Sequence, residues 1–97
     1  MLNLDFCKDY LVISTDKFDE FLDVLIGVAH SYVMSRISLT EEEVEADPKI
    51  EEQLNICEMI IVEHLFQQRT YTIDKNLVEN PILKSILSYY ADEWILW

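Results

Sequence analysis

Glycine and proline, the residues that most often form tight turns, are scarce in this sequence. The 97 residues contain one glycine and two prolines, so few positions favour a turn. An all-β domain would need many short strands joined by turns. We therefore expect a few long helices rather than many strands. The length fits one domain that spans residues 1–97.

Basic residues are also few. Seven lysines and arginines accompany 19 aspartates and glutamates, which gives a formal net charge of −12. Binding to the phosphates of nucleic acids requires clustered basic side chains, and an anionic membrane surface attracts the same residues. The composition therefore disfavours both kinds of partner.

Cysteines and long apolar runs are limited as well. Cys7 and Cys57 are too few for a disulfide framework and indicate a reducing, intracellular setting. The first ten residues lack the basic and apolar regions of a signal peptide. No run of about 18 apolar residues is present, so we expect no membrane-spanning helix.

The longest apolar pattern runs from Pro48 to Arg69. Residues spaced by three or four positions fall on one stripe of a helix. The stripe comprises Ile50, Leu54, Cys57, Ile61, Leu65 and Gln68, and it is widened by Ile56, Met59, Ile60 and Phe66. So wide an apolar arc is typical of a helix that packs on more than one side. Asp47 is suited to cap the first turn and Pro48 to occupy its first position, so we predict a central helix here.

Three further segments have helical spacing. A short helix is predicted within Leu2–Leu11, a second long helix over Lys17–Ile37, and a final helix that begins at Asn80-Pro81. Gly27 lies inside the second long helix, where glycine costs about 1 kcal/mol relative to alanine. We interpret it as a point of close approach by a neighbouring helix.

The remaining segments are predicted to connect these helices. Ser38–Asp47 reads as an acidic, solvated linker in which Thr40 and Glu43 can form a capping box and one helical turn. Thr70–Ile73 is β-prone and predicts an extended arm or a short strand. The expected fold is therefore all-α: a small bundle of three main helices plus a short N-terminal helix, with an extended arm before the last helix.

We find no catalytic or metal-binding constellation in the sequence. His30 and His64 are the only histidines, and both are expected to be structural. No HExxH, CxxC or phosphate-binding glycine-rich motif is present, and Cys7 has no basic neighbour beyond Lys8 to activate its thiol. We expect no enzyme activity, no cofactor and no metal.

Three groups of residues are candidates for contact with partner proteins. Aromatic residues are enriched at interface hot spots, and the chain ends Trp-Ile-Leu-Trp. An extended arm can pair with a neighbouring subunit, and an acidic segment can face a positive partner. The candidates are Trp94 and Trp97 at the end, Arg69, Tyr71 and Ile73 in the arm, and Glu41, Glu42, Glu43 and Glu45 in the acidic segment.

The sequence resembles the head–tail connector family of tailed bacteriophages, also described as head-completion or DNA-packaging adaptor proteins. That family opens with a Lys-x-Tyr-Leu turn, an acidic cap and an apolar helix; its central helix ends His-x-x-x-x-Arg; and its last helix begins with proline. The matching positions are Lys8, Tyr10, Leu11, Asp16, Leu22, Leu25, Ile26, Ala29, Tyr32, His64, Arg69, Pro81, Ile86, Leu87 and Tyr90.

The resemblance extends from Asp5 to Tyr90, and the chain departs from the family in three places. Its linker is long and acidic, its tail is rich in tryptophan, and Ala91 stands where the family usually has arginine. The resemblance implies a ring of identical subunits below the portal protein, in the neck of the virion, assembled in the host cytoplasm. Such a ring extends the DNA channel, lets DNA pass without specific binding, and receives tail-attachment or stopper proteins. Some of the carboxylates from Glu41 to Glu52 would then face the channel.

Three other functions are compatible with parts of the sequence. An acidic helical inhibitor that mimics DNA would share the net charge, but it needs carboxylates spaced along one face. A generic helical dimerisation module would share the apolar pattern. A small enzyme with a metal or acid–base site would have to use a histidine such as His64.

Overall fold

The structure of the protein is a computed structural model, in which residues 2–91 are described. Six helices occupy these residues, and no strand occurs among them. In chain order the helices are α1 (Leu4–Leu11), α2 (Asp19–Ser35), α3 (Glu41–Ala46), α4 (Pro48–Gln68), α5 (Lys75–Val78) and α6 (Pro81–Tyr90). The predicted all-α fold is confirmed.

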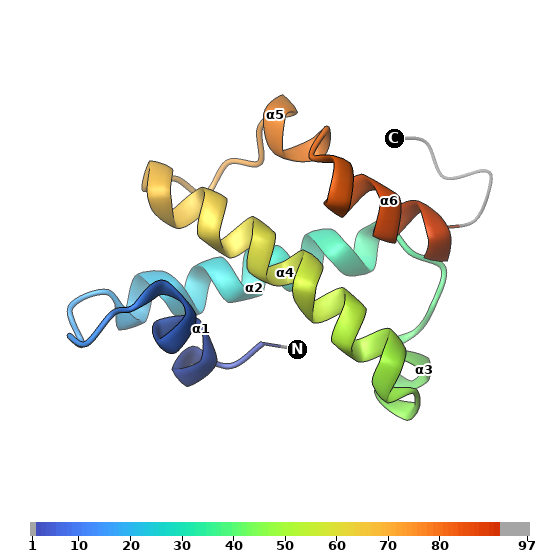
Figure 1. Cartoon of the computed structure of the whole chain (residues 1–97), viewed down its shortest axis with the longest axis horizontal. Helices are drawn as coiled ribbons and strands as arrows, with labels where there is room; N and C mark the ends of the chain where they lie inside the picture. Colours follow the sequence, from blue (N-terminus) through green and yellow to red (C-terminus); the bar gives the residue numbers. More distant parts are fainter. Residues whose placement is uncertain (1, 92–97) are drawn as a thin grey trace.

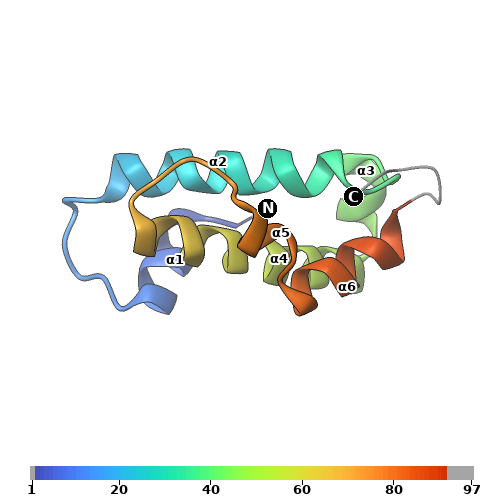
Figure 2. The same ribbon diagram turned by 90° about the horizontal axis from the view of Figure 1, so that it is seen from above.

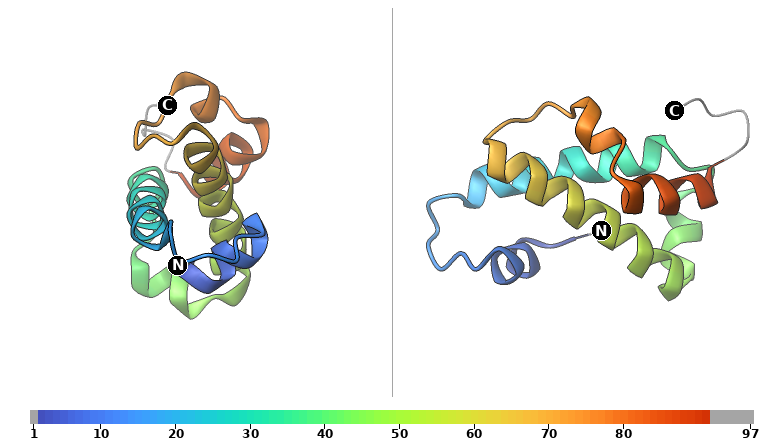
Figure 3. Two further views of the ribbon diagram at one scale, coloured as in Figure 1. Left: turned by 90° about the vertical axis from the view of Figure 1, so that its left-hand side faces the viewer. Right: turned by 45° about the horizontal axis from the view of Figure 1, so that its top comes forward.

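The helices form two layers around α4. Figure 1 shows α2 and α4 crossing in opposite directions, with α1 and α6 on opposite sides of α4. Seen from above, α2 runs along one side, while α1, α4 and α6 share the other (Figure 2). The end-on view in Figure 3 shows the same division. The molecule measures 42 × 30 × 18 Å, and its thickness corresponds to two helices of about 10 Å each.

The core is built on the apolar stripe of α4. Leu54, Cys57, Ile61 and Leu65 are buried as the spacing predicts, whereas Gln68 at the end of the stripe is exposed. The stripe packs against α2 on one side and α6 on the other. The partners include Leu22, Leu25, Ala29 and Val33 of α2, and Leu83 and Leu87 of α6. A helix covered from two sides needs this wide apolar arc.

Both capping residues predicted before the prolines are confirmed. The Asp47 carboxylate accepts a hydrogen bond from the backbone N–H of Lys49 at 3.0 Å. The Asn80 side chain accepts from Ile82 and Leu83 at 3.0 and 3.1 Å. These bonds satisfy backbone donors that have no partner within the helix, so α4 and α6 begin where the sequence indicates.

The first helix lies within its predicted range, whereas the predicted bounds of the second were two residues too wide at each end. Asn3 caps α1, and its Oδ1 accepts from the backbone N–H of Phe6 at 2.8 Å, so the helix starts at Leu4. No side chain caps the start of α2. The carboxylate of Asp16, in the loop before the helix, lies 3.0 Å from the Lys8 ammonium, and the carboxylate of Asp19, in the first turn of α2, lies 2.9 Å from the same group. These ion pairs tie the start of α2 to α1.

Each of the two connecting segments contains a short helix, and only the first of these was predicted. The Thr40–Glu43 capping box is present and starts α3, which buries Val44. The arm prediction was incomplete: residues 70–74 form irregular backbone without a strand, and Asp74 then caps the short helix α5 through the N–H of Leu77. The sequence analysis missed α5 because four residues are too few to show helical spacing.

Gly27 does not mark a close approach, so that interpretation was wrong. A Cβ atom built on Gly27 would meet no neighbouring atom within 4 Å. Without a steric requirement, glycine at this position only weakens the helix.

We predict that Gly27→Ala stabilises the protein by about 1 kcal/mol, because alanine loses less backbone entropy in a helix. Urea unfolding followed by circular dichroism measures this difference. A loss of stability would instead show that a neighbour occupies the space beside Gly27.

Val12 ends α1 in an unfavourable backbone conformation. Its φ of 58° and ψ of 49° lie in the left-handed region, where a residue with a Cβ atom is strained. The conformation is retained because the N–H of Ile13 reaches back to the carbonyl of Lys8 at 2.8 Å and closes the helix end. The Val12 side chain itself is 90% exposed and contributes little to packing.

Val12→Gly is therefore expected to raise the free energy of unfolding by about 1 kcal/mol, the cost of left-handed backbone for a residue with a Cβ. Val12→Ala keeps the Cβ and is the matched control, expected to change stability little. Equal effects of the two variants in urea unfolding would contradict backbone strain as the cause.

Candidate interaction surfaces

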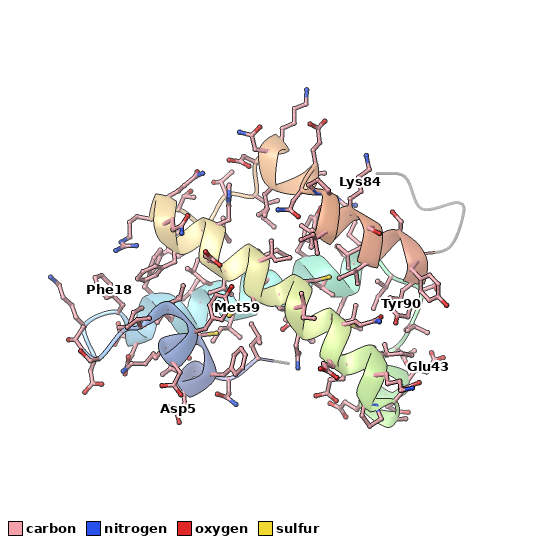
Figure 4. The ribbon with its side chains drawn as sticks, in the orientation of Figure 1. Asp5, Phe18, Glu43, Met59, Lys84 and Tyr90 are labelled. Atoms are coloured by element: carbon pink, nitrogen blue, oxygen red, sulfur yellow. The ribbon has the colours of Figure 1, made fainter. Side chains whose placement is uncertain are left out.

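An apolar groove runs between α1 and α4. Its volume is about 410 Å³. The apolar side chains that line it are Leu2, Phe6, Tyr10, Ile56, Met59 and Ile60. Three of them, Phe6, Tyr10 and Ile56, are about half exposed, and Figure 4 places Met59 where α4 faces α1. Large apolar side chains gathered on one open surface are typical of a contact site.

Helical spacing explains why these side chains gather. Phe6 and Tyr10 are four residues apart on α1, and Ile56 and Ile60 are four apart on α4, so each pair lies on one face of its helix. The sequence pattern placed Ile56 in the widened apolar stripe of the central helix. That assignment was wrong, because α1 covers only part of α4 at this end and Ile56 stays about half exposed.

The charged residues beside the groove are acidic. Glu52 lines it on α4, and the charge of Glu63 raises the pKa of the Tyr10 phenol. Asp5 projects from the outer side of α1 (Figure 4). A partner for this groove has to approach carboxylates without adding negative charge.

The four glutamates predicted as contact residues have different surroundings. Glu41, Glu42, Glu43 and Glu45 all lie on α3 and are exposed. Two of them have structural contacts: Glu43 accepts from the backbone N–H of Thr40 at 3.0 Å, and Glu41 pairs with His30. Glu42 and Glu45 present their carboxylates to solvent, as the prediction of a solvated segment requires.

Arg69 belongs to the end of α4 and not to an extended arm. Its backbone is left-handed, with φ of 52°. The guanidinium lies 3.9 Å from the ring centroid of Phe66 and 4.9 Å from that of Phe18, and it donates to the Phe66 carbonyl. Arg69 thus closes the helix and covers an aromatic pair that joins α2 to α4.

The other predicted contact residues have different surroundings. Tyr71 is more than half exposed, and its ring centroid lies 5.3 Å from that of Phe21 in an edge-to-face arrangement. Ile73 packs against the core and is only partly exposed. Trp94 and Trp97 lie outside the described residues. Among the residues predicted for the arm, Tyr71 is therefore the aromatic side chain that a partner can reach.

A histidine–glutamate cluster joins α2, α3 and α4. Glu58 of α4 is only 2% exposed, and its Oε2 lies 2.9 Å from Nδ1 of His30 on α2. The other ring nitrogen, Nε2, contacts Glu41 of α3. Glu58 also accepts a hydrogen bond from the backbone N–H of Leu2 at 3.3 Å. The sequence analysis missed this cluster, although the isolated carboxylate of Glu58 between Cys57 and Met59 was a signal for a buried partner.

His64 and the cysteines have simpler surroundings. His64 Nε2 lies 3.3 Å from the Asp74 carboxylate. The N–H of Leu77 and the contact with His64 lower the pKa of Asp74. Burial, assisted by the charge of Glu58, raises the pKa of the Cys7 thiol to about 11 and that of Cys57 to about 12. Both thiols are therefore neutral near neutral pH.

Within residues 2–91, no group of three or more His, Cys, Asp or Glu side chains is arranged to hold a metal ion. No helix in the same range is long and apolar enough to cross a membrane. Comparison with protein-family models, curated proteins and solved structures found no match. The function therefore has to be argued from the residues and their arrangement.

We predict that Arg69→Ala lowers the free energy of unfolding by about 1 kcal/mol, because it removes a cation stacked on two aromatic rings. Lys75→Ala removes an exposed cation of the same charge and serves as the matched control. Urea unfolding of both variants measures the difference. Equal stabilities of the two variants would show that the stacking contributes nothing.

Proposed function

We propose that this chain is a structural subunit that works through protein–protein contacts, and that it forms a ring below the portal in the neck of a tailed bacteriophage. The ring extends the DNA channel and connects head to tail. Its partners are further copies of the chain, the portal protein and the tail-attachment or stopper proteins. The protein carries out no chemical reaction in this role.

The positions that carry the resemblance support this proposal through their place in the fold. Leu22, Leu25 and Ala29 are fully buried where α2 meets the core. Tyr90 at the end of α6 donates a hydrogen bond to Gln53 of α4, and Arg69 stacks at the end of α4. The residues that carry the resemblance to the connector family thus hold the helices of this chain together.

The observation that carries the proposal is the open apolar groove between α1 and α4. An acidic chain with formal net charge −12 repels its own copies unless local contacts compensate. Phe6, Tyr10 and Ile56 supply apolar area for such a contact. We assign the groove to a contact between neighbouring subunits.

The surface that fits this groove is α6 of a second copy. Unlike α1 to α4, α6 contains no acidic residue. Its exposed Ile82 and Tyr89 are seven residues apart, which puts them on one helical face with Ser85 between them. Anchors at such spacing are typical of a helix that docks in an apolar groove. Tyr89 and Ser85 can donate hydrogen bonds to carboxylates such as Glu52.

The two surfaces can both be used in one assembly. α1 and α6 lie on opposite sides of α4 (Figure 1), so the groove of one subunit can receive α6 of the next. A contact between two different surfaces repeats from copy to copy and forms a closed ring when the rotation allows it. This geometry supports a ring more than a simple dimerisation module.

The acidic surface fits a conduit for DNA. Glu42 and Glu45 are exposed on α3, and carboxylates repel phosphates, so DNA can slide past without binding. A DNA mimic is supported less well. It needs several free carboxylates along one face, and on α3 both Glu41 and Glu43 are held by contacts within the chain.

Two variants with complementary defects test the subunit contact. Ile56→Glu places a charge in the groove, and Ile82→Glu places one on α6; both side chains are about half exposed, so the fold should tolerate the changes. Each variant alone is expected to lose self-association at least about tenfold. An equimolar mixture should form a one-to-one complex, because each variant retains the surface that its partner lacks. Sedimentation velocity measures these species.

Val24→Glu is the matched control, since Val24 is a half-exposed apolar residue of α2 that does not line the groove. It should associate as the native chain does. Failure of the mixture to form a complex would overturn the assignment of groove and α6. The neck assignment is tested separately by electron microscopy of the native chain mixed with portal complexes of the same virus, where an absence of co-assembly would contradict it.

A further inference from the structure

The imidazole of His30 has a carboxylate at each of its two ring nitrogens. Nδ1 lies 2.9 Å from Oε2 of Glu58, and Nε2 contacts Oε1 of Glu41. The three side chains come from α2, α4 and α3. The imidazole therefore connects three helices through one pair of hydrogen bonds.

Both contacts can exist together only when an extra proton is present. An ionised carboxylate accepts hydrogen bonds but donates none, and a neutral imidazole carries a single N–H. Two carboxylates facing both ring nitrogens therefore require an imidazolium or a protonated carboxyl group. Burial disfavours a charge on His30, but the hydrogen bonds and charges of Glu58 and Glu41 outweigh burial and raise the pKa of His30 above 6.5. The proton accordingly resides on the imidazole.

The two carboxylates differ in their access to water. The side chain of Glu58 is 2% exposed, whereas that of Glu41 is 63% exposed. A buried carboxylate without a donor is costly, while an exposed one is solvated. When His30 loses a proton, its remaining N–H should therefore stay with Glu58, and the contact with Glu41 should break.

The other groups around this cluster do not replace the lost proton. Cys7 of α1 and Cys57 of α4 lie near Glu58, and their thiol pKa values are raised to about 11 and about 12. The backbone N–H of Leu2 donates to Glu58 and does not titrate. Among the described residues, Glu58 and Glu41 are thus the charged groups that act on His30.

We propose that His30 is a proton-dependent latch, in which the imidazolium holds α3 against α2 and α4, and loss of the proton releases Glu41 and loosens α3. Apart from this contact, α3 is held mainly by buried Val44 and its packing on α4. Its four glutamates among six residues repel one another and favour release. The latch is independent of ring formation and goes beyond the proposed function.

The direction of the pH dependence follows from the raised pKa of His30. The stabilisation is complete below the ordinary histidine pKa of 6.5 and is lost as the pH rises through the higher value in the folded protein. The latch is therefore closed in mildly acidic solution and opens toward alkaline pH.

Nuclear magnetic resonance of the full chain tests the latch. The His30 ring protons report its titration, and the Val44 methyl groups report the docking of α3. In the native protein we expect both to change with one midpoint above 6.5. In Glu41→Gln the midpoint of the His30 titration should fall, because one of the two carboxylates that favour the imidazolium is gone. The change in the Val44 signals should be lost, because the amide can accept a hydrogen bond from the imidazolium or donate one to the neutral imidazole and so holds α3 in both states.

Glu42→Gln removes the same charge from the neighbouring position on α3 and is the matched control. In this variant the His30 and Val44 signals should still change with one common midpoint above 6.5. A native His30 midpoint at or below 6.5 would overturn the proposal. Val44 signals that stay constant while His30 titrates would also overturn it.

Discussion

The fold depends on the burial of α4 from two sides. Leu54, Ile61 and Leu65 are fully enclosed or nearly so, and α2 and α6 pack against the helix that carries them. Burial of a leucine or isoleucine side chain contributes roughly 1.5–3 kcal/mol, so this one helix supplies a large part of the apolar driving force. The shorter helices add caps, ion pairs and partial cover at its ends, and α1 leaves an apolar groove because it covers α4 incompletely.

The same packing buries one charged residue, Glu58, in the apolar core. Glu58 occupies a position on α4 between buried neighbours, and its carboxylate is tolerated because His30 and the N–H of Leu2 satisfy it. The cluster joins the N-terminal segment and three helices. It therefore links the protonation of one side chain to the position of α3, the most acidic element of the chain.

The proposed function rests on three features of the surface. The apolar groove, the acid-free helix α6 and the exposed carboxylates of α3 lie on separate parts of the surface. Under the proposed function, the groove of one copy receives α6 of the next, and the exposed carboxylates of α3 face DNA that must pass without being held.

The sequence alone determined the class of the fold, the course of α4 and the start of α6, because spacing and caps such as Asp47 and Asn80 act within a few residues along the chain. It also indicated the capping box of α3. It did not determine that Glu58 is buried, that Ile56 and Tyr10 are exposed, that Gly27 has free space beside it, or that Arg69 stacks on Phe66 and Phe18. Those outcomes depend on which helices meet and where their cover ends, and such contacts between distant residues leave no local pattern in the sequence.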